Sequence, residues 1–166
     1  MKIYITGSVA SGKTTFAKKL SKQLNIKYYE LDNIVHAGLG KLRPKRTPEE
    51  QISLIKEIDK NQNWIIEGTY RPSCSVVLDL ADLIVFLDIS LWIRKVRIIK
   101  RFLKQQLHFE KCNYKSDMYM FKLMFKWTRE FEENRKEFEK ILYTYQSKLI
   151  IAKNQKQAFE KIKLLK

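Results

Sequence analysis

Short apolar runs alternate with longer amphipathic segments along this chain of 166 residues. Runs of β-branched and aromatic residues, each bounded by polar or turn residues, predict strands over 2–6, 27–31, 63–67, 82–88 and 147–152. Apolar positions at helical spacing predict helices over 13–24, 49–60, 91–106, 118–146 and 154–165. Thr47 can cap the second of these helices, with Pro48 in its first position. Alternation of strands and helices indicates an α/β fold, with a mainly parallel sheet covered on both faces.

The junction between the first strand and the first helix carries the strongest motif. Gly7-Ser8-Val9-Ala10-Ser11-Gly12-Lys13-Thr14 fits G-x-x-x-x-G-K-[ST] at every fixed position. In this context, backbone N–H groups and the helix N-terminus point at a bound phosphate. Lys13 would reach the β- and γ-phosphates, and the Thr14 hydroxyl would ligate Mg²⁺. The motif therefore predicts binding of ATP and Mg²⁺ by Gly7, Ser8, Ala10, Ser11, Gly12, Lys13, Thr14 and Thr15.

Acidic residues follow the second and third predicted strands, at the edge of the sheet where ligands bind. Asp32 could bind an acceptor hydroxyl or accept its proton, and it could equally cap a helix that begins at Asn33. Glu67, followed by Gly68, is placed to support Mg²⁺. Arg71 could contact substrate or phosphate, or it could be an ordinary surface arginine.

The net charge of +15 is concentrated in one segment, since residues 91–130 hold 11 basic and 3 acidic side chains. This segment could be a solvated lysine-rich surface, a lid that closes over phosphate, or a nucleic-acid or membrane-surface patch. Arg94, Arg97 and Arg101 share one helical stripe that suits a phosphoryl group, with a solvated basic face as the alternative. We expect Trp92, Val96, Ile99 and Leu103 to dock this helix. A break in the helical pattern from His108 to Asp117 predicts a mobile lid over 102–128.

Several classes of protein are excluded by what the chain does not contain. No run of about 18 apolar residues is present, so we expect neither a transmembrane helix nor a membrane partner. The glycine motif begins at residue 7, which leaves no room for a signal peptide. Cys74 and Cys112 lie far apart without further ligands at metal-binding spacing, as in reduced thiols of a cytoplasmic protein. At this length we expect a single domain over 1–166.

These motifs together resemble those of the adenylate kinase-like small P-loop kinases. The stretch Ile66-Glu67-Gly68-Thr69-Tyr70-Arg71 is similar to the adenylate kinase Asp-Gly-Phe-Pro-Arg stretch. Leu87-Asp88-Ile89-Ser90, followed by Arg97 and Arg101, is similar to the strand and paired arginines that enter the adenylate kinase lid. The closer resemblance is to the bacterial family often labelled "DNA topology modulation protein" or FlaR, through Glu30-Leu31-Asp32, Trp64–Tyr70, Ala81–Asp88 and Lys100-Arg101.

The resemblance implies a three-layer P-loop fold with sheet order 2-3-1-4-5 and a helical lid. It implies that Glu67 orients metal-bound water and that Arg97 and Arg101 close over ATP. Arg129 or Arg135 would complete the phosphate clamp. The stretch Ala152-Lys153-Asn154, after the last strand, would present its backbone to the adenine.

One departure concerns the acceptor. Adenylate kinases carry an arginine three residues beyond the acid that follows strand two, and Val35 stands there in this chain. Arg43 and Arg46 could replace that contact, and Asp32 could hold an acceptor hydroxyl as in shikimate kinase-like enzymes. We therefore expect an ATP- and Mg²⁺-dependent kinase acting on a small nucleotide, nucleoside or hydroxylated metabolite. The alternative is a nucleotide-responsive nucleic-acid-binding or regulatory protein, with nucleic acid bound only through generic basic charge.

Overall fold

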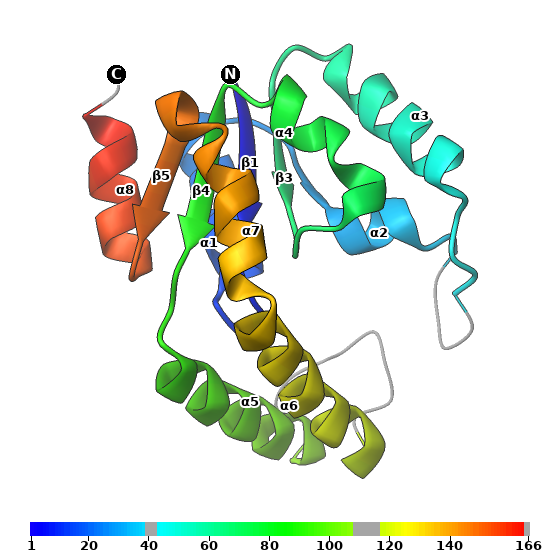
Figure 1. Ribbon diagram of the computed structural model, residues 1–166, viewed down its shortest axis with the longest axis vertical. Coiled ribbons are helices and arrows are strands. Elements are labelled where there is room, and N and C mark those ends of the chain that lie inside the picture. Colours follow the sequence, from blue (N-terminus) through cyan, green and yellow to red (C-terminus); the bar gives the residue numbers. More distant parts are fainter. Residues whose placement is uncertain (39–42, 108–116, 165–166) are drawn as a thin grey trace.

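The computed structural model describes residues 1–38, 43–107 and 117–164. Five parallel strands form one sheet in the order β2-β3-β1-β4-β5 (Figure 1), which confirms the predicted order. The strands are β1 (Lys2–Thr6), β2 (Tyr28–Glu30), β3 (Trp64–Glu67), β4 (Leu83–Leu87) and β5 (Leu149–Ala152). The central strand, β1, is buried from Ile3 to Thr6, as expected for a strand covered on both faces.

Helices pack on both faces of the sheet and make three layers. On one face, α1 (Lys13–Leu24) and α8 (Gln155–Lys163) bring Phe16, Leu20 and Ile162 against Ile5 and Val85. The opposite face is covered by α2 (Leu31–Val35), α3 (Pro48–Asp59), α4 (Val76–Leu80) and α7 (Arg135–Tyr143). Two short 3₁₀ helices, η1 (Pro72–Cys74) and η2 (Gln146–Lys148), complete the connections. Each apolar strand face thus has its own helical layer.

Local signals explain some helix boundaries and fail at others. The predicted start at Thr47 is confirmed as a capping box, because the Thr47 hydroxyl accepts from the backbone of Glu50 and the Glu50 carboxylate accepts from the backbone of Thr47. The predicted single helix over 118–146 is wrong, since Asn134 separates α6 (Met118–Glu133) from α7. Helix α4 was not predicted, because five residues are too few to show a helical period, and α2 begins at Leu31, two residues before the alternative start predicted at Asn33.

Helix α5 (Leu91–Gln106) and α6 form an α5–α6 pair that extends away from the sheet (Figure 1). The rings of Phe102 and Phe121 lie 4.6 Å apart between them. The predicted docking face of α5 is wrong, because Trp92, Ile99 and Leu103 are exposed. The buried face instead carries Arg94, Ile98 and Gln105. None of the helices in the described ranges is long and apolar enough to cross a membrane.

The predicted lid over 102–128 falls on the end of α5, the start of α6 and the residues between them. Residues 108–116, which include His108 and Cys112, lie outside the part of the chain that the structure describes. Cys74 is buried and its thiol donates to Gln51 Oε1 at 3.2 Å, so it is held within the core.

Candidate functional site

The glycine loop between β1 and α1 has the geometry that its motif requires. Gly7 has a φ of 149° and Gly12 a φ of 92°, both in a region that favours glycine. A Cβ atom on Gly7 would lie 2.8 Å from the carbonyl oxygen of Leu87, so no side chain fits there. Ala10 also has a positive φ, of 58°. The loop therefore turns tightly onto the N-terminus of α1, where backbone N–H groups and the helix dipole favour an anion.

Two opposite charges lie beside the loop, the half-buried ammonium of Lys13 and the buried carboxylate of Glu67. The Lys13 ammonium donates to the carbonyl oxygens of Gly7 at 3.0 Å and Ser8 at 2.8 Å. Burial lowers the pKa of Lys13, and the Glu67 carboxylate opposes this effect. Burial raises the pKa of Glu67, and Lys13 and the hydroxyl of Thr14 oppose that shift. Each charge is thus held in the site at a desolvation cost that its neighbour partly offsets.

The oxygens of Thr14 and Glu67 fit a magnesium site. The Thr14 hydroxyl donates to Glu67 Oε1 at 2.7 Å, at the junction of the loop and β3. Mg²⁺ commonly takes one or two protein oxygens and completes its shell with phosphate oxygens and water. Within the described ranges, no group of three or more His, Cys, Asp or Glu residues could hold a metal ion. A metal ion here would therefore depend on the phosphates of a bound nucleotide.

The two arginines predicted to close over ATP both lie near the loop. Arg97 Nη1 donates to the carbonyl oxygens of Ser11 at 2.9 Å and Ala10 at 3.2 Å. The positive charges of Arg94 and Arg101 add to the lowering of the Lys13 pKa, which places both guanidiniums within electrostatic range of the loop lysine. The α5 helix therefore brings a concentrated positive charge to the expected position of a polyphosphate.

Arg94 has a role that differs from the one predicted for it. It is 1% exposed, and its guanidinium donates to the Ser8 hydroxyl, the Glu132 carboxylate and the backbone carbonyl of Ile89. It also stacks over the ring of Phe131, at 5.5 Å. Arg94 thus joins the glycine loop to α6 instead of facing an open phosphate site. Its spacing of four residues from Ile98, which is also buried, is the sequence signal for this inward face.

Arg135, predicted to belong to the phosphate clamp, lies in a carboxylate network. Its guanidinium is 2.7 Å from Glu139, 2.9 Å from Asp88 and 3.9 Å from Glu132. Asp88 therefore pairs with Arg135, and the residue before the first turn of α5 is Ser90. The other arginine predicted for this role, Arg129, is 73% exposed and lies 3.7 Å from Glu133. Of the two, Arg129 has the guanidinium that is open to a ligand.

The acceptor side of the site is built from α2 and the segment after β3. Arg71 Nη2 lies 2.5 Å from Asp32 Oδ1. Asp32 is in the first turn of α2 and is not its N-cap, because the helix begins at Leu31. The two backbones approach closely, since a Cβ atom on Gly68 would lie 2.4 Å from the Cβ of Leu31. The structure thus brings Asp32 and Arg71 together and removes helix capping as the explanation of Asp32.

Arg43 and Arg46, the candidates to replace the arginine missing at Val35, bind oxygens of α2 and the residues that follow it. Arg43 donates to the carbonyl oxygen of Gly38 at 3.2 Å and to Asn33 Oδ1 at 2.8 Å. Arg46 donates to three carbonyl oxygens at the end of α2 and beyond, those of Asn33, Ile34 and His36. Both guanidiniums satisfy carbonyl groups that the helix end leaves without partners.

Near β5, the structure shows a contact with the glycine loop that no sequence motif predicted. Gln155 Nε2, at the start of α8, donates to the carbonyl oxygen of Gly12 at 3.0 Å. Lys153, whose backbone was predicted to be presented to adenine, has an exposed side chain, and its backbone N–H donates to Gln157 Oε1 at 2.7 Å. Gln155 therefore contacts the nucleotide loop directly.

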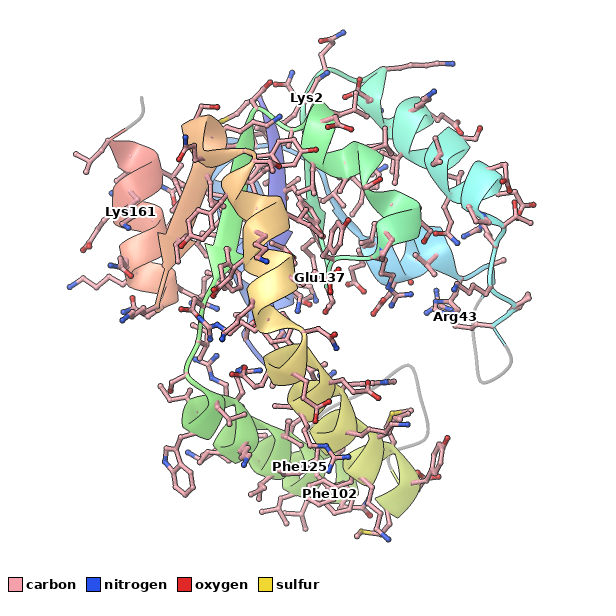
Figure 2. All side chains as sticks on the ribbon, in the orientation of Figure 1. Lys2, Arg43, Phe102, Phe125, Glu137 and Lys161 are labelled. Atoms are coloured by element: carbon pink, nitrogen blue, oxygen red, sulfur yellow. The ribbon has the colours of Figure 1, made fainter. Side chains whose placement is uncertain are left out.

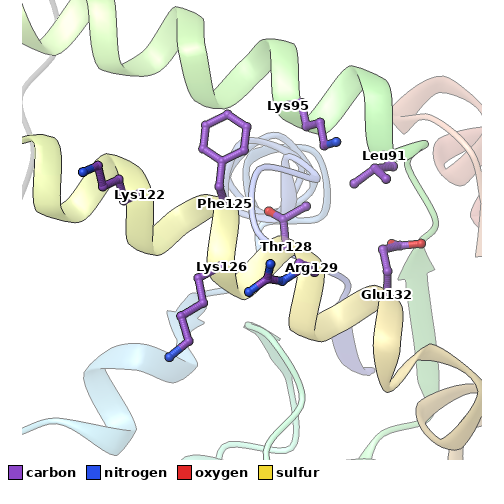
Figure 3. Close-up of a pocket in the computed structure, with 8 residues that line it drawn as sticks. All are labelled: Leu91, Lys95, Lys122, Phe125, Lys126, Thr128, Arg129 and Glu132. Carbon is purple, nitrogen blue, oxygen red and sulfur yellow. The ribbon is translucent and has the colours of Figure 1, made fainter.

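A cavity of about 410 Å³ opens between α5 and α6 (Figure 3). Four cationic side chains line it, together with an aromatic ring and one carboxylate; the lining is Leu91, Lys95, Lys122, Phe125, Lys126, Thr128, Arg129 and Glu132. Glu132 is the residue that Arg94 connects to the glycine loop. The cavity is thus linked to the glycine loop through Glu132 and Arg94.

Comparison with known proteins supports a small P-loop kinase, although no family model matches the chain. Cytidylate kinase of Sulfurisphaera tokodaii is 36% identical over 61% of this chain and 62% of its own length. Cytidylate kinase of Aeropyrum pernix is 27% identical over 58% of this chain and 62% of its own length. The chain thus spans less than two thirds of these curated relatives. An uncharacterized protein from Eubacterium ventriosum, of known crystal structure, is 17% identical over 98% of this chain and 95% of its own, with a TM-score of 0.55. That likeness shows a shared fold over nearly the whole chain.

Proposed function

We propose that the protein is an ATP- and Mg²⁺-dependent kinase that phosphorylates a small nucleotide or nucleoside. The proposal rests on two groups of residues at the same edge of the sheet, one suited to the donor phosphates and the other to the acceptor. Lys13, Thr14 and Glu67 lie at the glycine loop. Glu30, the register partner of Glu67, leads directly into the Asp32–Arg71 pair. A donor phosphate and an acceptor oxygen would thus be held side by side.

The proposed mechanism uses positioning and charge neutralisation. The loop N–H groups and Lys13 hold the phosphates, while Arg97 and Arg101 neutralise charge that develops during transfer. Thr14 and Glu67 would hold Mg²⁺, which supplies further positive charge to the phosphate oxygens. Where the acceptor group is a hydroxyl, the Asp32 carboxylate accepts its hydrogen bond and takes its proton, and Arg71 keeps that carboxylate in place. Where the acceptor group is a nucleotide phosphate, its attacking oxygen is already ionised, and Arg71, held by Asp32, would bind that phosphate. Gln155 and Ser8 help to fix the shape of the loop.

The choice of a nucleotide-class acceptor rests on two kinds of support. The similar proteins from two archaeal sources are named cytidylate kinases. Arg71 retains 31% of its side-chain surface while paired with Asp32, so its guanidinium can also bind an acceptor phosphate or sugar oxygen. We also propose that residues 1–166 form a single domain and that the chain is related to the proteins labelled topology modulation proteins.

The first prediction is acceptor-dependent release of ADP. Wild-type protein with Mg·ATP should release ADP with at least one acceptor from a panel of CMP, dCMP, cytidine, deoxyadenosine and shikimate. Lys13→Ala should abolish this release and the thermal stabilisation by Mg·ATP. Asp32→Asn should abolish release but keep that stabilisation, since Asp32 serves the acceptor. For wild type, the stabilisation is about 2.7 kcal/mol when ligand is at 100 times Kd, a shift of several degrees.

Two results would contradict this assignment. One is a wild-type protein that shows neither thermal stabilisation by Mg·ATP nor ADP release with any acceptor. The other is an Asp32→Asn variant that keeps full turnover, which would separate the acid from the chemistry. Glu160→Gln, an exposed acid on α8, is the matched control and should behave as wild type.

A further inference from the structure

The outer side of the α5–α6 pair exposes an apolar stripe. Trp92, Val96, Ile99, Leu103 and Leu107 recur every three or four residues and therefore share one face of the helix and its C-cap. We call these residues the outer stripe. Val96 is half-buried, and the other four are 43% to 75% exposed. Of the ten large apolar side chains that are exposed in the described ranges, eight lie between Trp92 and Trp127. An apolar surface concentrated in this way indicates a binding partner.

The charge beside the stripe restricts what that partner can be. Helix α5 holds six basic residues and no acidic residue. Lys95, Lys100 and Lys104 flank the outer stripe along the helix. A second copy of the chain seated on the stripe would bring the same cations together, which costs Coulomb energy. The complementary partner is therefore an anionic surface with an apolar interior.

The shape and composition of the stripe favour a lipid surface over nucleic acid. Figure 2 shows Phe102 and Phe125 in the part of the pair remote from the sheet, where the Phe121 ring packs 4.6 Å and 5.0 Å from theirs. With these aromatic rings packed against one another, the outer stripe faces solvent with Trp92 as its one aromatic side chain. Ile99, Leu103 and Leu107 cannot stack on bases as aromatic rings do. A ridge of Trp and Leu flanked by lysines is typical of helices that lie in the lipid interface.

We infer that the outer stripe binds the surface of anionic lipid bilayers. The apolar side chains would insert between the headgroups, and the exposed Lys100 and Lys104 would contact the lipid phosphates. This inference is independent of the proposed kinase activity, because the outer stripe lies on the face of α5 opposite Arg94 and Arg101.

The test is sedimentation of the full chain with phosphatidylcholine vesicles that contain or lack phosphatidylglycerol. Wild type should bind only the anionic vesicles, with a blue shift of tryptophan fluorescence as Trp92 leaves water. Ile99→Asp/Leu103→Asp should lower binding at least tenfold, and Lys100→Gln/Lys104→Gln should lower it several-fold. The matched controls are Leu164→Asp, an exposed apolar site outside the pair, and Lys18→Gln/Lys22→Gln, an exposed lysine pair of the same spacing on α1. Both controls should bind as wild type, and circular dichroism should confirm that every variant is folded.

Three results would overturn the inference. Equal binding by wild type and Ile99→Asp/Leu103→Asp would show that charge alone attracts the vesicles. Failure of wild type to bind, together with a dimer that the stripe substitutions dissociate, would assign the stripe to a second copy. Failure to bind vesicles together with stripe-dependent binding of a single-stranded oligonucleotide would assign it to nucleic acid.

Discussion

At the scale of single residues, Mg²⁺ binding requires the ionised form of Glu67, whereas burial in the folded protein favours the protonated form. A magnesium ligand must be ionised, whereas burial at the end of β3 raises the pKa of Glu67. Because the folded protein holds the Glu67 proton more tightly than the unfolded chain, this group favours folding below its unfolded pKa of about 4.3. That contribution is lost as the pH rises through the higher, folded-state pKa.

Glu67→Gln should therefore stabilise the protein without ligand at neutral pH while lowering Mg·ATP binding. The gain over wild type should be absent near pH 4, grow with pH and become constant above the folded-state pKa, at about 1.4 kcal/mol per unit of pKa shift. Urea unfolding across this pH range measures the gain. A destabilised variant at neutral pH would mean that the bonds of the carboxylate to Thr14 and Lys13 outweigh its burial.

At the scale of elements, the sequence predicts the features that neighbouring residues determine and misses those that depend on residues distant in the chain. The strands, the glycine loop and the capping box at Thr47 follow from neighbouring residues, and the structure has them as predicted. The orientation of α5 depends on partners distant in sequence. Its apolar stripe favoured Trp92 and Leu103 as the inward face, but Ser8 and Glu132 offer Arg94 a buried network. Gln155 was missed for the same reason, since only the fold brings it to Gly12.

Arg94 links α5 to the glycine loop through the Ser8 hydroxyl. A double-mutant cycle can measure the coupling energy between these two side chains. Arg94→Met should cost about 3 kcal/mol of stability, because it leaves the half-buried Glu132 without its closest partner. Ser8→Ala should cost about 1 kcal/mol alone and almost nothing in the Arg94→Met background, since the shared bond is already gone.

Both variants should also weaken Mg·ATP binding, by loosening the loop. Ser73→Ala, which removes a hydroxyl bonded to Gln51 away from the loop, is the control and should leave nucleotide binding unchanged. Strictly additive effects of Arg94→Met and Ser8→Ala on stability and nucleotide affinity would show that the two side chains act independently. Urea unfolding and a nucleotide titration together measure the cycle.

At the scale of the whole molecule, the α5–α6 pair should respond to nucleotide while the sheet does not. Arg97 would bind phosphate oxygens instead of the backbone carbonyls of Ala10 and Ser11, and Arg101 would bind phosphate oxygens as well, which draws α5 against the loop. Amide exchange in α5 and α6 should slow with a non-hydrolysable ATP analogue and Mg²⁺, and exchange in α3 should stay the same. Equal protection of α5 and α6 with and without the analogue would assign the arginines a purely structural role.

The central place of β1 in the sheet has a consequence for how such a protein can evolve. Apart from Glu67 at the end of β3, the proposed donor contacts come from the loop after β1 and from α1, α5 and α8, whereas Asp32 and Arg71 belong to the part of the chain between β2 and β4. Gene changes in that middle part that spare Glu67 could replace one acceptor with another while the ATP machinery stays intact. Descendants of one ancestor could thus diverge in what they phosphorylate while sharing how they use ATP.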